Sequence, residues 1–217
     1  CGVPACGLDA HFGYGQWMDY RLDVPKDCGN RGEDYIDVAG RSFREFMAGR
    51  LAGVEGQMIT MADCGGHMTT AFPEVRLKQV LEMRGADSGM WANICALPAF
   101  WVGLLYDDEA LEEAASLASN LRADDVMAAR LSVAKDGFSG RLGSHDVYDL
   151  ATRLVSISNK GLRRRGILDL GGGDESGFLS RLSDCLDNQR TPAGMLLDAL
   201  HSEWKNGVSQ MFNANSL

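Results

Sequence analysis

Several features that would assign this chain of 217 residues to a broad functional class are absent from it. It lacks an excess of basic residues: Asp and Glu number 30 against 21 Lys and Arg, which gives a net charge of −9 and an isoelectric point near 4.9. Nucleic-acid binding requires a basic face, so this balance argues against a nucleic-acid partner. An anionic small substrate remains compatible with it, because a few cations in a cleft suffice, together with a divalent metal.

Long apolar runs are also missing. The longest, residues 94–106, is interrupted by Pro98 and Gly103 and is shorter than the roughly 18–20 residues of a membrane span. It is better interpreted as core, and we expect no membrane partner. No signal-peptide pattern is visible. Because the sequence begins with Cys1 rather than Met, we expect a processed chain or one that starts inside a longer protein.

The six cysteines include no CxxC pair, and Cys64 with His67 is a single weak metal-ligand spacing. Free thiols in a reducing, cytoplasmic compartment are therefore expected. The glycine-rich stretch LGGGDESG at 170–177 lacks the Lys-Ser/Thr of a phosphate-binding loop, so it is interpreted as a connector. The three arginines at 163–165 are typical of a helix C-terminus.

Helical spacing dominates the second half of the chain. The patterns predict helices from 107, from 144 or 145 to about 165, over 175–187, and over 191–204 with Thr191 as the cap. In the first half they predict a helix after Ser42, a loop over 52–66 and an irregular segment over 1–40 with one alternating run at 14–24. We expect an α+β chain with a sheet part at 1–106 and a helical part at 107–217.

One segment in the first half alternates polar and apolar side chains, as a half-buried strand does. In FPEVRLKQVLEMRGAD, residues Glu74, Arg76, Lys78, Glu82 and Arg84 fall on one face, which only Val80 interrupts. Val75, Leu77, Leu81 and Met83 fall on the other, which only Gln79 interrupts. The pattern predicts one strand, with Glu82 and Arg84 on the same side and Leu81 and Met83 buried.

Two interpretations of the charged side stay open on the pattern alone. It is an exposed sheet face whose ion pairs contribute little, or it is a site in which carboxylates hold Mg²⁺ and arginines bind phosphate or carboxylate groups.

A family resemblance favours the second interpretation. The segments FPEVRLKQVLEMRGAD, CALPAFWVGLLYDDEAL, YRLDVP, YIDVAGRSFREFMAGRL and RTPAGMLLDALHSEW closely resemble the C-terminal half of plant-type glutamate–cysteine ligase. That resemblance implies a glutamine-synthetase-like curved antiparallel sheet, present here in part, with a charged concave face as the active site. It implies the first step of glutathione synthesis, in which ATP activates L-glutamate as γ-glutamyl phosphate and L-cysteine attacks it. A plastid location would follow for a plant-like host.

The resemblance also implies roles for individual residues. Glu82 would bind Mg²⁺, Arg84 and Arg76 would be catalytic, and Glu74 would bind substrate. The cysteine pocket would be lined by aromatic side chains, namely Trp91, Phe100, Trp101 and Tyr106. For each of these aromatics, packing in the core is the alternative.

The chain also departs from the family pattern. SGMWAN stands where the family has GGPWRR, so Ala92 and Asn93 replace two arginines, and DVPKDCG stands where the family has DVPMYFV. Members of the family are about twice as long. The alternatives are therefore an inactive fragment or interaction module, and a sister carboxylate–amine ligase. The missing N-terminal half or a second copy of the chain would be the expected protein partner.

Overall fold

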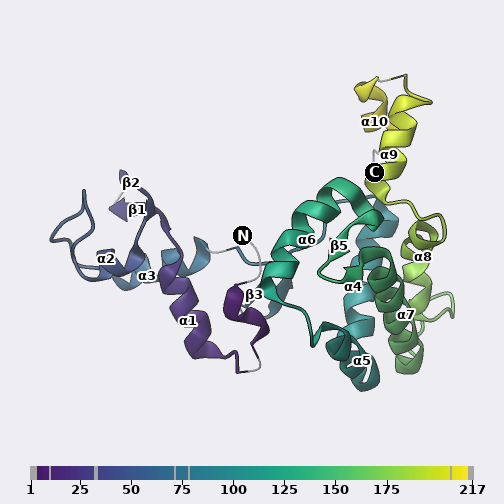
Figure 1. Cartoon of the computed structure of the whole chain (residues 1–217), viewed down its shortest axis with the longest axis horizontal. Helices are drawn as coiled ribbons and strands as arrows, with labels where there is room; N and C mark the ends of the chain where they lie inside the picture. The colour runs from purple at the N-terminus through teal and green to yellow at the C-terminus, as the bar shows by residue number, and fades with distance from the viewer. Residues whose placement is uncertain are drawn as a thin grey trace. The chain divides into compact units, whose positions relative to one another are not determined.

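The chain divides between Gly85 and Ala86 into two compact units, residues 1–85 and 86–217. A computed structural model describes residues 4–9, 11–31, 34–70, 72–77, 79–205 and 207–214 (Figure 1). The sequence patterns predict a boundary after residue 106. The structure differs because the apolar run forms helix α4 (Trp91–Leu105), which packs within the second unit, chiefly against α7 (Val147–Arg165).

The first unit mixes short helices with strand pairs. Its elements in chain order are η1 (Ala5–Leu8), α1 (Tyr14–Asp23), β1 (Lys26–Arg31), β2 (Asp34–Arg41), α2 (Phe43–Met47), α3 (Met61–Thr70), β3 (Val75–Leu77) and β4 (Leu81–Met83). The helix expected after Ser42 is confirmed as α2, and the Ser42 hydroxyl accepts a hydrogen bond from the Glu45 amide at 3.3 Å.

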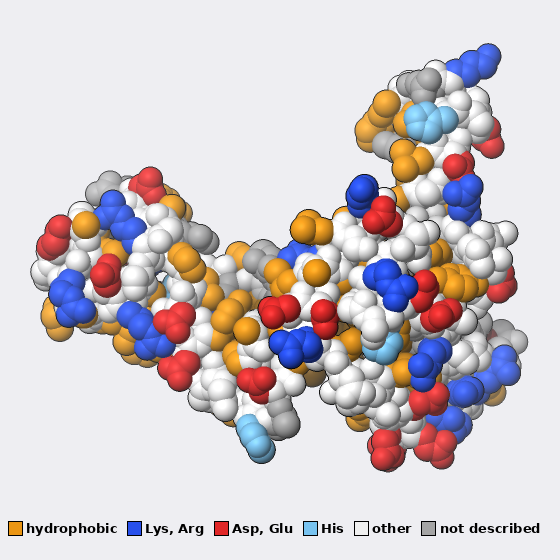
Figure 2. Space-filling model, viewed as in Figure 1, with side chains coloured by type: hydrophobic (Ala, Val, Ile, Leu, Met, Phe, Trp, Pro, Cys, Tyr) orange, Lys and Arg blue, Asp and Glu red, His pale blue; other side chains and the backbone are white. Residues whose placement is uncertain are grey.

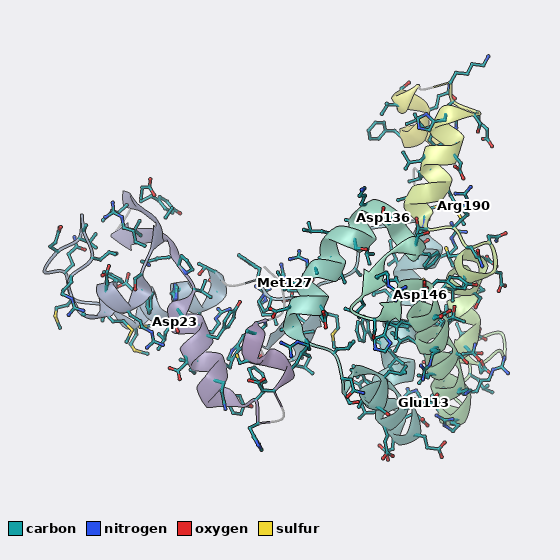
Figure 3. All side chains as sticks on the ribbon, in the orientation of Figure 1. Asp23, Glu113, Met127, Asp136, Asp146 and Arg190 are labelled. Carbon is teal, nitrogen blue, oxygen red and sulfur yellow. The ribbon has the colours of Figure 1, made fainter. Side chains whose placement is uncertain are left out.

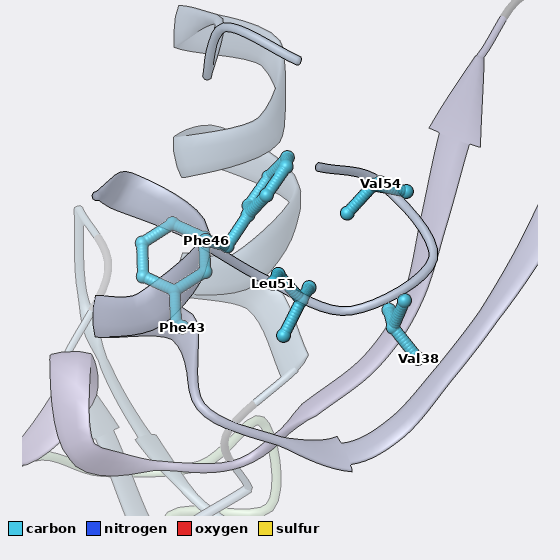
Figure 4. Close-up of a cluster of buried hydrophobic side chains, with 5 residues drawn as sticks. All are labelled: Val38, Phe43, Phe46, Leu51 and Val54. Carbon is cyan, nitrogen blue, oxygen red and sulfur yellow. The ribbon is translucent and has the colours of Figure 1, made fainter. Parts of the chain in front are cut away.

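A small apolar core lies between α2 and the β1–β2 pair. It consists of Val38, Phe43, Phe46, Leu51 and Val54, each at most 5% exposed (Figure 4). The ring of His67 stacks on Phe43 with centroids 3.8 Å apart, and the ammonium of the buried Lys26 lies 5.1 Å from the Phe46 ring centroid.

Two segments of the first unit are helical where the sequence patterns predict an alternating run, at 14–24, and a loop, over 52–66. The alternating run forms α1, because Trp17 pairs with Tyr20 and Arg21 at helical spacing, and Pro25 keeps Val24 extended and ends the helix. The expected loop over 52–66 was wrong from residue 61. There Thr60 and Asp63 cap the start of α3 reciprocally, each side chain bonding the other's backbone amide.

The predicted single strand over 74–84 is instead a hairpin. β3 and β4 pair antiparallel, with Val75 opposite Met83, Arg76 opposite Glu82, and Leu77 opposite Leu81. In this register an even-numbered residue always meets an even-numbered one. Glu74, Arg76, Glu82 and Arg84 therefore still share one face and Val75, Leu81 and Met83 the other, although the chain reverses between β3 and β4. Lys78 lies outside the residues that the structure describes.

The second unit is helical apart from one short strand pair. Its elements are α4, α5 (Asp108–Ala118), α6 (Ala123–Asp136), η2 (Gly137–Ser139), β5 (Arg141–Leu142), β6 (His145–Asp146), α7, η3 (Glu175–Leu179), α8 (Ser180–Asp187), α9 (Pro192–His201) and α10 (Val208–Ala214). The helices predicted from 107, from 144 or 145, over 175–187 and over 191–204 are confirmed, with starts and ends shifted by a few residues. The sequence patterns did not predict α4, α6 or α10 as helices.

The helix starts of the second unit follow from capping side chains. Asp107 accepts from the Ala110 amide at 2.9 Å, and Thr191 accepts from the Gly194 amide at 3.1 Å. Asp146, labelled in Figure 3, accepts from the amides of Tyr148 and Asp149 and starts α7. At the other end of α7, Gly166 adopts a left-handed conformation with φ of 64° and stops the helix.

α4 and α7 run side by side in the second unit and approach closely (Figure 1). The approach depends on two glycines, since a Cβ on Gly161 would overlap the carbonyl oxygen of Gly103. The Ser158 hydroxyl, buried in the contact, donates to the Phe100 carbonyl at 2.9 Å. The two helices therefore pack backbone to backbone at this point.

The α+β class is confirmed. In the part of the chain that the structure describes, the strands form three separate antiparallel pairs rather than one curved sheet. No helix among the described residues is long and apolar enough to cross a membrane. On the face in Figure 2, acidic and basic side chains are interspersed over the helical unit rather than gathered into a basic area.

Candidate active-site hairpin

The charged face of the β3–β4 hairpin brings four of the predicted site residues together. Arg76 and Glu82 lie directly opposite each other in the register, and the Arg84 amide donates to the Glu74 carbonyl at 2.8 Å, which extends the pairing by one step. Cross-strand neighbours on one face are close enough for their side chains to interact. Glu74, Arg76, Glu82 and Arg84 therefore form one local group, as the alternation predicted.

Glu82 joins the two arginines. Arg76 Nε lies 2.5 Å from Glu82 Oε2, and Arg84 Nη1 lies 3.4 Å from Glu82 Oε1. The Arg76 side chain is only 13% exposed, whereas those of Arg84 and Glu82 are 31% and 37% exposed. The first contact is therefore the stronger one, because it is shorter and partly shielded from water, while the second resembles an ordinary surface pair.

These contacts hold Glu82 in its charged form. The hydrogen bond from Arg76 is the main cause that lowers the pKa of Glu82, and the positive charges of Arg76 and Arg84 lower it further. Both carboxylate oxygens are thus engaged by guanidinium groups. Mg²⁺ requires about six oxygen ligands, and the described residues contain no cluster of three or more His, Cys, Asp or Glu side chains that could hold a metal ion.

Two residues that the sequence analysis did not single out complete the group. The Cζ atoms of Arg76 and Arg84 lie 5.7 and 5.1 Å from the ring centroid of Phe72. Arg21, on α1 and only 2% exposed, has its Cζ 5.4 Å from the Trp17 ring centroid. Burial lowers the pKa of Arg21, and the charge of Arg76 acts in the same direction, which makes Arg21 an electrostatic neighbour of the charged face.

The apolar face of the hairpin corrects one prediction. Leu81 is 59% exposed and Val75 45% exposed, and Met83 is half-buried, so the expectation of a buried Leu81 was wrong. The two exposed side chains line an open hollow of about 430 Å³ with other apolar residues of the first unit, among them Leu8, Phe12, Tyr14, Trp17 and Pro73. A two-stranded hairpin has no further strand to carry a layer of core packing, which explains the exposure.

The four aromatic candidates for a cysteine pocket all lie in the second unit and do not converge there. Phe100 and Trp101 are half-buried, pack edge to face with centroids 5.4 Å apart, and border the core clusters. Trp91 begins α4 and Tyr106 follows its end, and they are 69% and 70% exposed. A helix rises about 1.5 Å per residue, so these two lie roughly 22 Å apart along α4 and cannot line one pocket of amino-acid size.

Tyr106 takes part in a network at the end of α7. Arg165 Cζ lies 5.7 Å from its ring centroid, and the Arg165 side chain pairs with Glu175 at 3.4 Å. The neighbouring Arg164 contacts Asp107 with Nη2 at 2.5 Å and Nε at 3.0 Å. The arginines of 163–165 thus lie in the last turn of α7, as predicted, and two of them connect that turn to neighbouring segments.

The cysteines that the structure describes give no second site. Cys6, Cys64, Cys95 and Cys185 are free thiols, as expected, and burial raises the pKa of Cys185. The candidate chemistry of the first unit therefore rests on the guanidinium and carboxylate groups of the hairpin.

Comparison with known proteins relates the chain to one family. The model of glutamate–cysteine ligase family 2 (GCS2) matches residues 1–214, which include the hairpin and nearly all of both units.

Individual relatives are similar over almost the whole chain. Glutamate–cysteine ligase A, chloroplastic, of Oryza sativa subsp. indica is 41% identical over 205 residues, which is 94% of this chain and 40% of the relative. The chloroplastic glutamate–cysteine ligases of Nicotiana tabacum and Arabidopsis thaliana are 41% and 39% identical, each over 94% of this chain and 38% of the relative. The chain spans about two fifths of the length of the curated relatives it matches.

Proposed function

The chain belongs to glutamate–cysteine ligase family 2, and we propose that it supplies part of the active site of an enzyme that joins L-glutamate to L-cysteine using ATP. The single observation that carries the proposal is the pairing of Arg76 and Arg84 around Glu82 on one face of the hairpin. Two guanidinium groups held side by side suit substrates that bring carboxylate and phosphate groups together.

The proposed reaction has two steps. The γ-carboxylate of glutamate attacks the γ-phosphorus of ATP, which forms γ-glutamyl phosphate and releases ADP. The amine of cysteine then attacks the acyl carbon, loses a proton, and expels inorganic phosphate, leaving γ-glutamylcysteine. Negative charge accumulates on phosphoryl oxygens in the first step and on the acyl oxygen in the second, and arginines stabilise such charge by position and electrostatics.

We assign Arg84 and Arg76 to contacts with these anionic groups, with Glu74 beside them as a substrate-binding candidate. Arg84 is the more exposed of the two arginines and has the weaker contact with Glu82. Arg84 therefore loses a weaker contact with Glu82 than Arg76 would when it binds a substrate oxygen. Arg76, more buried and more tightly bonded to Glu82, provides a fixed positive charge beside it.

Mg²⁺ does not fit the described residues by themselves. Glu82, which the resemblance makes a metal ligand, has both oxygens bonded by arginine, and no group of three or more His, Cys, Asp or Glu side chains forms a metal site among the described residues. Glu82 would ligate a metal only after its salt bridge with Arg76 opened and other oxygen ligands joined it.

Catalysis is proposed to require sequence beyond this chain. The relatives are about two and a half times as long, since the chain matches 40% of their length. A glutamine-synthetase-like curved sheet would need further strands beside β3 and β4. Of the aromatics, exposed Trp91 and Tyr106 remain candidates for substrate contact, while Phe100 and Trp101 are better explained as core. The relatives named above are chloroplastic, which favours a plastid over the cytoplasm.

The test is to measure ADP release by the purified chain and by the product of its whole reading frame. We expect release that depends on both glutamate and cysteine from the longer product, and little or none from the 217-residue chain, because groups that act as a unit fail together. Replacing cysteine with other amines separates this ligase from a sister ligase. A longer product that releases no ADP with any amine would support a non-catalytic role instead.

A further inference from the structure

Phe72 lies against both arginines of the charged face. Its ring centroid is 5.7 Å from Arg76 Cζ and 5.1 Å from Arg84 Cζ, and the same two guanidinium groups share the carboxylate of Glu82. We propose that Phe72 is a positioning residue that holds Arg76 and Arg84 together in readiness for a phosphoryl group. The inference rests on the proposed function of the charged face and adds a residue to it.

The need for such a residue follows from the charges. Two guanidinium groups close together repel each other, and Glu82, which pairs with both, carries a single negative charge. Arg21 adds a third positive charge close enough to affect Arg76, while Glu74 is the other acid of the same face. The face of an aromatic ring attracts cations through its quadrupole. Phe72 therefore stabilises the arginine pair without adding a negative charge that would repel an anionic substrate.

The ring also preserves the hydrogen-bonding capacity of the arginines. A guanidinium group has five N–H donors, and Glu82 engages Nε of Arg76 and Nη1 of Arg84. A carboxylate in place of Phe72 would consume further donors, whereas contact with the ring face leaves them for a ligand. The arrangement fits a tetrahedral oxyanion, which can accept from two guanidinium groups at once.

Core packing does not account for Phe72. Its side chain is 41% exposed, and it is absent from the core cluster of the first unit. Phe12 offers a matched comparison within the same unit: it is 38% exposed, but it packs edge-on against Trp17, with centroids 6.4 Å apart, and lines the apolar hollow. The two phenylalanines are similarly exposed and differ in their neighbours.

The experiment titrates inorganic phosphate into the 217-residue chain labelled with ¹⁵N-arginine and follows the Nε–Hε signals, assigned with Arg76→Lys and Arg84→Lys. We expect saturable shifts of the Arg76 and Arg84 signals. Phe72→Leu should weaken phosphate binding on the order of tenfold, the size expected from losing two cation–π contacts. Phe72→Tyr should bind like the unaltered chain, and Phe12→Leu should leave affinity unchanged.

The amide spectrum shows whether each variant folds, and Phe72→Met replaces Phe72→Leu if the latter does not. The unaltered chain is expected to bind phosphate saturably. If the folded Phe72→Leu or Phe72→Met variant binds it with the same affinity, the positioning role of Phe72 is wrong, whereas the anion site itself is retained. Failure of Phe72→Tyr to retain affinity would also overturn the positioning role. If the unaltered chain shows no saturable shift at either arginine, the positioning role falls, and so does the hairpin's proposed place in the active site.

Discussion

The two units of the molecule, residues 1–85 and 86–217, differ in how they pack their apolar side chains. In the helical unit, α4 and α7 meet through Gly103 and Gly161, and Ser158 and Leu162 at this contact are completely buried. In the first unit, the hairpin leaves Leu81 and Val75 exposed and concentrates its strongest contacts among charged side chains. The α4–α7 contact of the helical unit is thus closed to water, whereas the apolar face of the hairpin is open to it.

This difference indicates where stability and chemistry lie. A backbone contact between two helices tolerates no added volume, so the helical unit should respond to substitution chiefly through the free energy of unfolding. The charged face of the hairpin is partly solvated, where ion pairs contribute little to folding. Substitutions of residues on this charged face should therefore affect ligand binding and turnover more than the free energy of unfolding.

The largest effect on stability is expected at the α4–α7 contact. Gly161→Ala would place a Cβ against the Gly103 carbonyl and force the helices apart, at about 3 kcal/mol of unfolding free energy. Gly177→Ala is the matched control, because a Cβ there meets nothing within 4 Å. Chemical denaturation of both variants measures the difference, and equal stabilities would show that the glycine contact does not hold the helical unit together.

A smaller, pH-dependent effect is expected at Asp107. Its hydrogen bonds from Arg164 are the main cause that lowers its pKa in the folded chain. A carboxyl with a lowered folded pKa stabilises the fold above its unfolded pKa of about 3.9, and the contribution disappears as the pH falls through the folded value. Asp107→Asn keeps a capping side chain but removes the charge. Its melting temperature should therefore lie below that of the unaltered chain at pH 7 and approach it near pH 3.

The control for this pair is Asp108→Asn, an exposed acid of the same helix turn. The melting temperatures of Asp107→Asn and the unaltered chain are compared at both pH values. If they differ as much at pH 3 as at pH 7, the ion pair with Arg164 is not the source of the difference.

The smallest effect is expected on the apolar side of the hairpin. Leu81→Ser should change the unfolding free energy by no more than about 0.5 kcal/mol, as most exposed substitutions do. Leu51→Ser, at a side chain 1% exposed in the core of the same unit, should be strongly destabilising. A loss at Leu81 comparable with that at Leu51 would show that the hairpin is packed on both faces, as the alternation first suggested.

Local signals account for what the sequence predicted correctly. Asp107 and Thr191 begin helices through their own side chains, so short-range patterns located α5 and α9. The segment KQV between β3 and β4 contains no Gly, Pro, Asn or Asp, and the reversal of the chain there carried no turn signal. The predicted grouping of the charged side chains on one face is confirmed only because the register pairs even-numbered residues with each other.

The site was predictable in part for the same reason. Glu74, Arg76, Glu82 and Arg84 share a face in a strand and in a hairpin alike, so alternation was sufficient to group them. Phe72 and Arg21 could not be found in this way. Phe72 precedes the alternating run, and its contact with Arg84 depends on the reversal of the chain, while Arg21 comes close through the helical form of a run that alternates in sequence.

The most direct test of the charged face is the steady-state turnover of Arg84→Lys in the product of the whole reading frame, with ATP, glutamate and cysteine saturating. Lysine keeps the charge but not the planar fork, so turnover should fall on the order of 10²-fold, the scale of one lost charge-stabilising donor. The melting temperature should remain close to that of the unaltered enzyme, and Arg50→Lys, at an exposed loop residue, should leave both unchanged. If Arg84→Lys retains most of the turnover, the hairpin is an ordinary charged surface and not part of the active site.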